Sequence, residues 1–264
     1  MEPIRREIAP ETYLNYVQTE KFKTGTLSVQ LIAPLEEKTA GFAALLPSVL
    51  RRGTMAHPDM RALSTALDQL YGASIGCTVR KKGENQCIGF VAGFIDEAFV
   101  PGGGKLLEPV CDLLGELLFD PLTRNGRFLS DYVESEKRNL ANAIASRVND
   151  KRTYATSQLI KALCAGEAYA VPRLGEGEDV EAITPEGLYA QYRKVLAESR
   201  VELFYMGRKS AEDVAEQLRR VLRELPRAAA FDAVGTEKQR AGGDVRRVEE
   251  RMDVTQGKLS MGFT

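Results

Sequence analysis

Histidine and tryptophan are the scarcest residues in this chain. Its 264 residues include no tryptophan and a single histidine, His57. Catalytic zinc sites in hydrolases commonly take two or more histidines and leave one position for water, so the chain lacks the ligands for such a site. A Ser-His-Asp or Cys-His nucleophile would have to use His57.

The chain also lacks an excess of charge of either sign and any long apolar run. Its 36 basic and 37 acidic residues give a net charge of −1, so we expect no nucleic-acid partner and no anionic membrane partner. No apolar run approaches the roughly 18 residues of a membrane span. Residues 1–10 carry charges where a signal peptide has its apolar core, so we expect no export by that route and a cytoplasmic location.

Cysteine is scarce and has no metal-binding spacing. The four cysteines stand at positions 77, 87, 111 and 164 and form no Cys-x-x-Cys pair, which argues against a zinc knuckle or a thioredoxin-type site. We expect reduced thiols in a cytoplasmic protein. The sequence leaves one alternative, a disulfide between Cys77 and Cys87 across a hairpin that turns at 81–85.

The periodicity of apolar residues predicts an α+β fold without strict βαβ alternation. Strands are predicted at 22–33, 73–79, 86–94 and 201–206, the middle two as a hairpin. Helices are predicted at 39–50, 58–71, 106–118, 130–165, 184–197 and 210–225. Thr39 is the expected N-cap of the first helix, and Pro47 should kink it because proline removes a backbone donor.

The chain is expected to divide into a main domain, a linker and the start of a second domain. Residues 1–226 carry the predicted elements, whereas 227–247 are rich in Ala, Gly and charge without sustained periodicity, which is typical of a linker. Residues 248–264 resume an alternating apolar pattern, as a strand would. We interpret them as the first strand of a truncated second domain that is homologous to the first.

A glycine-rich stretch at 101–105 precedes a predicted helix, and helix N-termini bind anions. A phosphate loop needs a glycine five positions before its Gly-Lys pair and a Ser or Thr after it, whereas Phe99 and Leu106 occupy those places. We therefore expect a plain connection between a strand and a helix.

Two further groupings could carry catalysis on paper. Ser64, His57 and Asp59 contain the residue types of a hydrolase triad, but no nucleophile-elbow glycine pattern accompanies them. Glu134 and Glu136 could act as paired carboxylates, yet cations alternate with them, which is typical of a solvated helix face. We expect His57 to lie in a polar turn without a catalytic role.

Several segments together resemble a known family. Residues 39–54, TAGFAALLPSVLRRGT, resemble the first active-site helix of the insulinase/pitrilysin zinc metallopeptidases, which carries the inverted motif His-x-x-Glu-His and ends in a similar Gly-Thr. The similarity continues through 67–74, 119–121, 133–137 and 183–206, and so covers nearly the whole chain. It implies an antiparallel sheet flanked by helices, as the first of two related α+β halves.

The resemblance also implies where the zinc motif would stand. Anchored on the Gly-Thr at 53–54, the family's first histidine falls on Ala44, its glutamate base on Pro47 and its second histidine on Ser48. None of these side chains is the imidazole, thiolate or carboxylate that zinc prefers. None can deprotonate a zinc-bound water.

The family's downstream glutamate ligand falls on Ala143, next to Asn142, when the acidic helix is used as the anchor. This position departs from the motif as well. The resemblance therefore implies an inactive member of the family with no catalytic residue, no metal ligand and no cofactor.

Members of this family form two related halves around a peptide-holding chamber, often as two subunits of which one is catalytic. The resemblance implies a non-catalytic subunit that shapes such a chamber or pairs with an active zinc peptidase, or forms a homo-oligomer, with a peptide as ligand. Residues 70–74 and 149–152 look similar to bacterial members associated with elongation factor P modification. Two alternatives stay open: an adaptor without a peptide chamber, and a peptidase that uses His57 with carboxylates.

Overall fold

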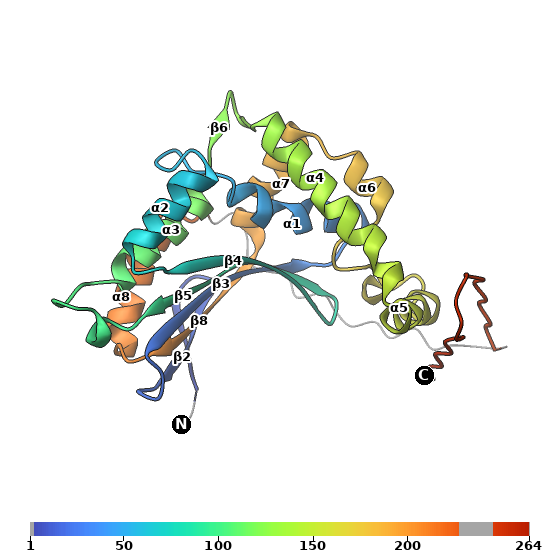
Figure 1. Cartoon of the computed structure of the whole chain (residues 1–264), viewed down its shortest axis with the longest axis horizontal. Helices are drawn as coiled ribbons and strands as arrows, with labels where there is room; N and C mark the ends of the chain where they lie inside the picture. Colours follow the sequence, from blue (N-terminus) through green and yellow to red (C-terminus); the bar gives the residue numbers. More distant parts are fainter. Residues whose placement is uncertain (1–2, 227–244, 264) are drawn as a thin grey trace.

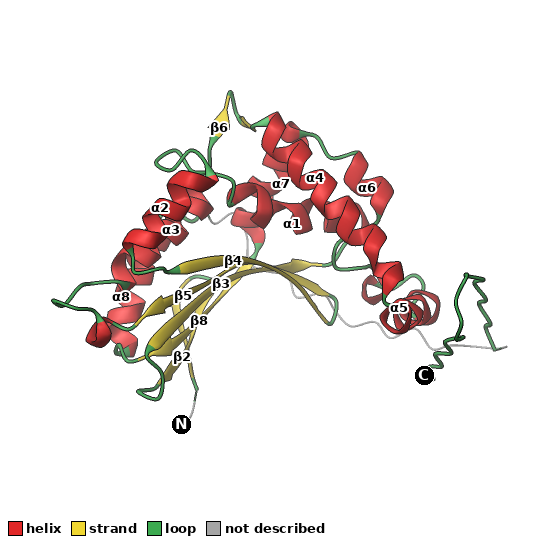
Figure 2. Ribbon diagram, viewed as in Figure 1, coloured by secondary structure: helices red, strands yellow, loops and turns green. Residues whose placement is uncertain are grey.

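A six-stranded sheet organises the computed structural model, which describes residues 3–226 and 245–263 (Figures 1 and 2). Its strands are β1 (Ile4–Ala9), β2 (Thr12–Gln18), β3 (Thr24–Pro34), β4 (Ser74–Lys82), β5 (Asn85–Ile95) and β8 (Arg200–Gly207). The spatial order is β1-β2-β8-β3-β5-β4. Neighbouring strands are antiparallel except β2 and β8, which run parallel. The predicted α+β class is confirmed, and the sheet is mixed rather than purely antiparallel.

The helices gather mainly on one side of this sheet (Figure 2). They are α1 (Glu37–Leu50), α2 (Met60–Gln69), α3 (Leu107–Phe119), α4 (Ser130–Ala145), α5 (Lys151–Leu163), α6 (Gly177–Glu181), α7 (Pro185–Glu198) and α8 (Ala211–Leu222). A short hairpin of β6 (Thr123–Arg124) and β7 (Arg127–Phe128) projects between α3 and α4. The core lies between the sheet and this helical layer, and α1 is its most buried helix, with nine buried residues of 14.

Helix α1 begins earlier than the sequence pattern predicts. Its N-cap is Glu36, in an extended conformation and without a side-chain cap, so the prediction of Thr39 as the cap is wrong. Pro47 stands inside α1, and the helix continues to Leu50. Proline has no N–H to donate to the preceding turn, while its own carbonyl accepts the backbone N–H of Arg51 at 3.1 Å.

The helix predicted over 130–165 is two helices. A short 3₁₀ turn, Ser146–Asn149, follows α4, and α5 starts afresh after Asp150. The Asp150 carboxylate accepts the backbone N–H groups of Arg152 and Thr153, both at 3.1 Å. An aspartate that caps the following turn satisfies donors that a helix start leaves free, so the chain reorients at this point.

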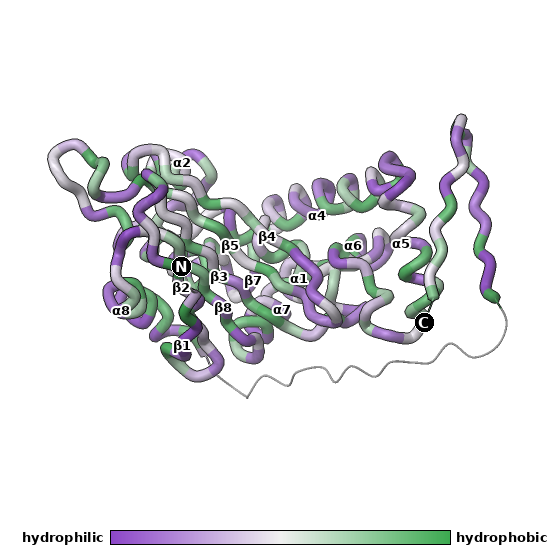
Figure 3. The backbone as a smooth tube through the Cα atoms, turned by 90° about the horizontal axis from the view of Figure 1, so that it is seen from below, coloured by the Kyte–Doolittle hydropathy of each residue, from purple (hydrophilic) through white to green (hydrophobic). Residues whose placement is uncertain are grey.

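The C-terminal part of the chain departs from the predicted strand. The predicted linker 227–247 lies outside the described residues except for its last three. Residues 245–263 contain no strand and run beside α5 (Figure 3), where Tyr154 donates to Glu250 at 3.0 Å. A strand needs a neighbour to pair with, and the sheet offers none there. The assignment of 248–264 to a second domain stays a prediction.

The cysteines are free thiols, and the bridge left open between Cys77 and Cys87 does not form. The two residues do not face each other in the β4–β5 hairpin, since Cys77 is opposite Phe90 and Cys87 is opposite Arg80. Within residues 3–226 and 245–263, no helix combines the length and the apolar character that crossing a membrane requires.

The close approach of the central strands β3 and β5 can be tested by substituting Gly89 on β5. Its φ is +151°, and a Cβ there would lie 2.0 Å from the carbonyl oxygen of Val29 on β3. We predict that Gly89→Ala lowers the free energy of unfolding by about 3 kcal/mol or more, because backbone must shift. Gly83→Ala, in the β4–β5 turn with open space around it, should cost only about 1 kcal/mol. Urea denaturation of both variants measures this, and equal losses would contradict the packing described.

Candidate functional site

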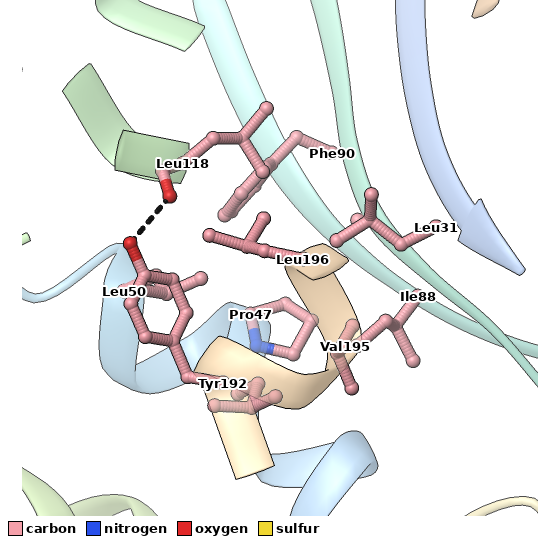
Figure 4. A pocket seen from close by; sticks show the side chains of 11 residues that line it. Leu31, Pro47, Leu50, Ile88, Phe90, Leu118, Tyr192, Val195 and Leu196 are labelled. Carbon is pink, nitrogen blue, oxygen red and sulfur yellow. Dashed lines mark hydrogen bonds between the residues drawn. The ribbon is translucent and has the colours of Figure 1, made fainter. Parts of the chain in front are cut away.

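The C-terminal half of α1 forms the candidate site, where it lies over β4 (Figure 1). Of the motif positions, Ala44 is 3% exposed, Pro47 is buried and Ser48 is half-buried. Pro47 borders an enclosed apolar space between α1, α7 and the sheet (Figure 4). That space measures about 10 Å³, which is hardly enough for one water molecule. Two of the motif positions have therefore become part of the core.

Cys77 of β4 is the nearest thiol to the former motif. Its Sγ donates to the carbonyl oxygen of Pro47 at 3.2 Å, and its thiol also contacts the Ser48 hydroxyl. Although Cys77 lies at the surface, the surrounding protein shields its thiol from water, which raises its pKa to about 11. The thiol therefore stays protonated near neutral pH when no metal is bound, and a lone thiol does not make up a zinc site.

The acidic helix α4 contributes an ion pair to the end of α1. Arg52 Nη1 lies 3.3 Å from Glu136 Oε1, and the guanidinium stands over the ring of Tyr132, 5.1 Å from its centroid. The Glu136 side chain is 12% exposed, whereas that of Glu134 is 51% exposed. The prediction of a solvated face is therefore right for Glu134 and wrong for Glu136, whose carboxylate is neutralised by Arg52.

The remaining motif position lies at the surface. Ala143 and Asn142 are both exposed on α4, whereas Ala44 is in the core. Together with Pro47 and Ser48, these side chains present no imidazole, thiolate or carboxylate, so they do not fit a zinc ion. No group of three or more His, Cys, Asp or Glu residues in the described part of the chain is arranged to hold a metal.

His57 stabilises the turn that follows α1. Its Nδ1 lies 2.8 Å from Glu116 Oε2 on α3, and Thr54 Oγ1 donates to the same oxygen at 3.0 Å. The backbone N–H of His57 donates to Thr54 Oγ1 at 2.9 Å, and the Thr54 N–H donates to the His57 carbonyl at 2.8 Å. Thr54 is fully buried, so this network supplies polar partners that its hydroxyl and backbone require.

The triad considered from the sequence does not assemble. Asp59 caps α2, since its Oδ1 accepts the N–H of Ala62 at 2.8 Å, and Ser64 is exposed. His57 pairs with Glu116, which the sequence reasoning missed because no spacing relates residues that meet only through folding. A wide groove of about 410 Å³ runs along α2 beside His57, and its lining is mixed, since Ala62 and Ala66 stand among polar side chains.

The glycine-rich stretch is a connection, as predicted. The N-terminus of α3 beyond it is occupied by the Glu97 carboxylate, whose Oε1 accepts the N–H of Leu106 at 2.9 Å and of Leu107 at 3.3 Å. Hydrogen bonds from Lys209 and from these amides lower the pKa of Glu97, against the opposing effect of burial. The chain's own carboxylate therefore takes the place of an anionic ligand.

We predict that alkylation of the Cys77 thiol depends on pH differently from alkylation of free cysteine. Because its pKa is about 11, labelling by iodoacetamide near about pH 8 should be about a hundredfold slower than for free cysteine in the same mixture. The rate should still rise beyond about pH 10, which mass spectrometry of the labelled peptide can follow. A half-maximal rate near about pH 8.5 would contradict the shielded thiol.

The His57–Glu116 contact is predicted to stabilise the fold. In a double-mutant cycle of His57→Ala and Glu116→Ala, the coupling energy should be about 0.5–1.5 kcal/mol by urea denaturation. His57→Ala combined with Ser64→Ala should be additive within about 0.5 kcal/mol, because the two side chains do not act together. Coupling to Ser64 with none to Glu116 would support the triad instead.

Comparison with known proteins identifies the fold. No protein-family model matches the chain. A probable inactive metalloprotease, YmfF of Bacillus subtilis (strain 168), is 35% identical over 249 residues, which are 94% of this chain and 58% of that protein. The crystal structure of a conserved protein from Enterococcus faecalis V583 has a TM-score of 0.82 at 26% identity, over 90% of this chain and 56% of that one.

The crystal structure of a peptidase M16 inactive domain from Pseudomonas fluorescens also shares the fold, with a TM-score of 0.69 at 18% identity over 89% of this chain and 53% of that one. The chain thus spans little more than half the length of these relatives. By its identity to YmfF over nearly all of its length, and by the shared fold, the chain is similar to the insulinase-like (M16) metallopeptidases and their inactive homologues.

Proposed function

We propose that this chain is a non-catalytic insulinase-like half, which holds an extended peptide at one edge of its sheet and pairs with an active zinc peptidase. The observation that carries this proposal is the position of α1 together with the side chains at its motif positions. The helix keeps its place against the sheet, while its motif positions hold Ala44, Pro47 and Ser48. The relative YmfF is named a probable inactive metalloprotease, which supports the same reading.

The groups around α1 offer no substitute for the lost chemistry. The Cys77 thiol is held protonated against the Pro47 carbonyl, and the Glu136 carboxylate is paired with Arg52. A metal-assisted hydrolysis needs both a bound water and a base to deprotonate it. The structural role of His57 at Glu116 also removes support from the alternative of a His57 peptidase.

The exposed edge of the sheet supports peptide binding. β4 is an edge strand, and a strand edge offers unpaired N–H and C=O groups to an incoming extended chain. In an antiparallel hairpin, alternate residues turn both backbone groups away from the partner strand. Arg173 reaches the Val79 carbonyl at 2.9 Å from outside the hairpin, so Ile75 and Cys77 turn their backbone groups outward as well.

The connection between α5 and α6 covers one end of this edge. Lys81 Nζ donates to the backbone carbonyls of Tyr169 and Val171, and Arg173 occupies the Val79 carbonyl. Cys77 is exposed and makes no backbone hydrogen bond outside the hairpin with any residue that the structure describes, whereas Ile75 is only 3% exposed. We call the edge from Ser74 to Thr78 the open edge, and it is the part available to a peptide.

Pairing with an active subunit rests on the family resemblance, and a homo-oligomer is the competing arrangement. The association with elongation factor P modification rests only on the similarity of residues 70–74 and 149–152, and it stays a prediction. An adaptor without a peptide chamber is the other function to be separated by experiment.

The test is to mix the chain with an insulinase-like homologue that carries an intact His-x-x-Glu-His motif. We expect one complex by size-exclusion chromatography, and peptide hydrolysis that depends on the homologue's motif and is unchanged by His57→Ala in this chain. The chain alone should not hydrolyse peptides. Hydrolysis by the chain alone that is lost in His57→Ala would contradict the proposal, and capture of a modification enzyme without the homologue would favour the adaptor.

A further inference from the structure

A cation beside the open edge forms no ion pair with the residues that the structure describes. Arg51 is the C-cap of α1 and is half-buried, and its backbone N–H donates to the Pro47 carbonyl at 3.1 Å. Its guanidinium makes no hydrogen bond or ion pair with any residue in the described part of the chain. The neighbouring Arg52, by contrast, is paired with Glu136.

Arg51 lies next to the residue at the centre of the open edge. Its charge acts on the Cys77 thiol and partly offsets the rise in pKa that burial causes. Cys77 in turn touches Pro47, four residues before Arg51 on α1. The backbone N–H of Arg51 donates to the same Pro47 carbonyl at 3.1 Å, so Arg51 lies on the α1 side of β4, next to Cys77.

The geometry of strand addition places certain peptide side chains on that same side. Residues that are opposite each other on adjacent strands point their side chains to the same face of the sheet. A peptide residue opposite Cys77 would thus point toward α1, where Arg51 lies. The backbone of the peptide would pair with the N–H and C=O groups of Cys77, which is exposed.

A guanidinium in this setting favours one kind of partner. It is always charged and carries five donors in a planar fork that matches a carboxylate in two parallel hydrogen bonds. Partial burial strengthens such a pair relative to one in water. The covered end of the edge adds two more cations, Lys81 and Arg173, which make the surroundings of the strand favourable to anions.

We propose that the open edge binds an extended peptide that carries a carboxylate, and that Arg51 holds this carboxylate while Cys77 pairs with the peptide backbone. This inference rests on the proposed function, since it uses the same edge. It adds the chemical class of the ligand. The carboxylate belongs either to an acidic side chain or to a peptide C-terminus, and the experiment below separates these sources.

The probes are fluorescein-labelled heptapeptides of alternating valine and threonine, whose binding to the 264-residue chain is measured by fluorescence anisotropy. One peptide has a central glutamate and an amidated C-terminus, the second has glutamine in its place, and the third has the glutamine with a free C-terminus. We expect at least one carboxylate peptide to bind about tenfold more tightly than the neutral peptide, because its hydrogen bonds are charge-assisted. Preference for the first or the third peptide identifies the source of the carboxylate.

Variants assign the effect to Arg51. Arg51→Gln should abolish the preference for the carboxylate while leaving the affinity for the neutral peptide unchanged, which also shows that the variant is folded. Arg51→Lys should keep part of the preference. Arg124→Gln, at the exposed end of β6, is the matched control and should behave as the unaltered chain.

The outcomes distinguish the role of Arg51 from the binding of a peptide at the edge. Equal affinity for all three peptides would overturn the role of Arg51 and leave peptide binding at the edge intact. A preference that survives in Arg51→Gln would also overturn it. Binding of none of the peptides would overturn both this inference and the proposal that the edge holds a peptide.

Discussion

The packing of α1 against the sheet is the constraint on which the rest of the structure depends. Nine of its 14 residues are buried, and Pro47 and Leu50 meet Tyr192, Val195 and Leu196 of α7 over the central strands (Figure 4). Ionisable zinc ligands in such a setting would need partners, because burying an unpaired charge is costly. Small and apolar side chains at Ala44 and Pro47 remove that cost. The substitutions that take away the metal site therefore favour the helix as a packing element.

The C-terminal end of α1 also makes contacts that hold three neighbouring elements in place. Arg52 ties it to α4 through Glu136, Thr54 and His57 tie the following turn to Glu116 of α3, and the Pro47 carbonyl binds the thiol of β4. These contacts come from three separate elements and hold the open edge in a fixed position relative to α1. A fold that is inherited from a peptidase can in this way keep a peptide-binding edge after the catalytic groups are gone. Preorganised edges bind with a smaller entropic cost than mobile ones.

Local patterns predicted much of this fold, and long-range contacts account for what they missed. The strand predicted at 22–33 is β3, the hairpin is β4–β5, and Thr184 caps α7 by accepting the Gly187 N–H at 3.0 Å. β1 and β2 were missed: they form a local hairpin, and only β2 joins the rest of the sheet, through β8, which lies nearly the whole domain away in sequence. The pairing of His57 with Glu116 and the approach of Arg173 to β4 likewise carry no signal in sequence spacing. The placement of the lost motif depended on family resemblance rather than on physical pattern.

The most direct test of the central claim is the zinc content of the purified chain after equilibration with zinc and dialysis. The side chains at 44, 47, 48 and 143 are Ala, Pro, Ser and Ala, and the nearby thiol is protonated at neutral pH. The account therefore predicts far less than stoichiometric zinc by atomic absorption, with no change in Ser48→Ala or Cys77→Ser. One zinc ion per chain that is lost in either variant would contradict it.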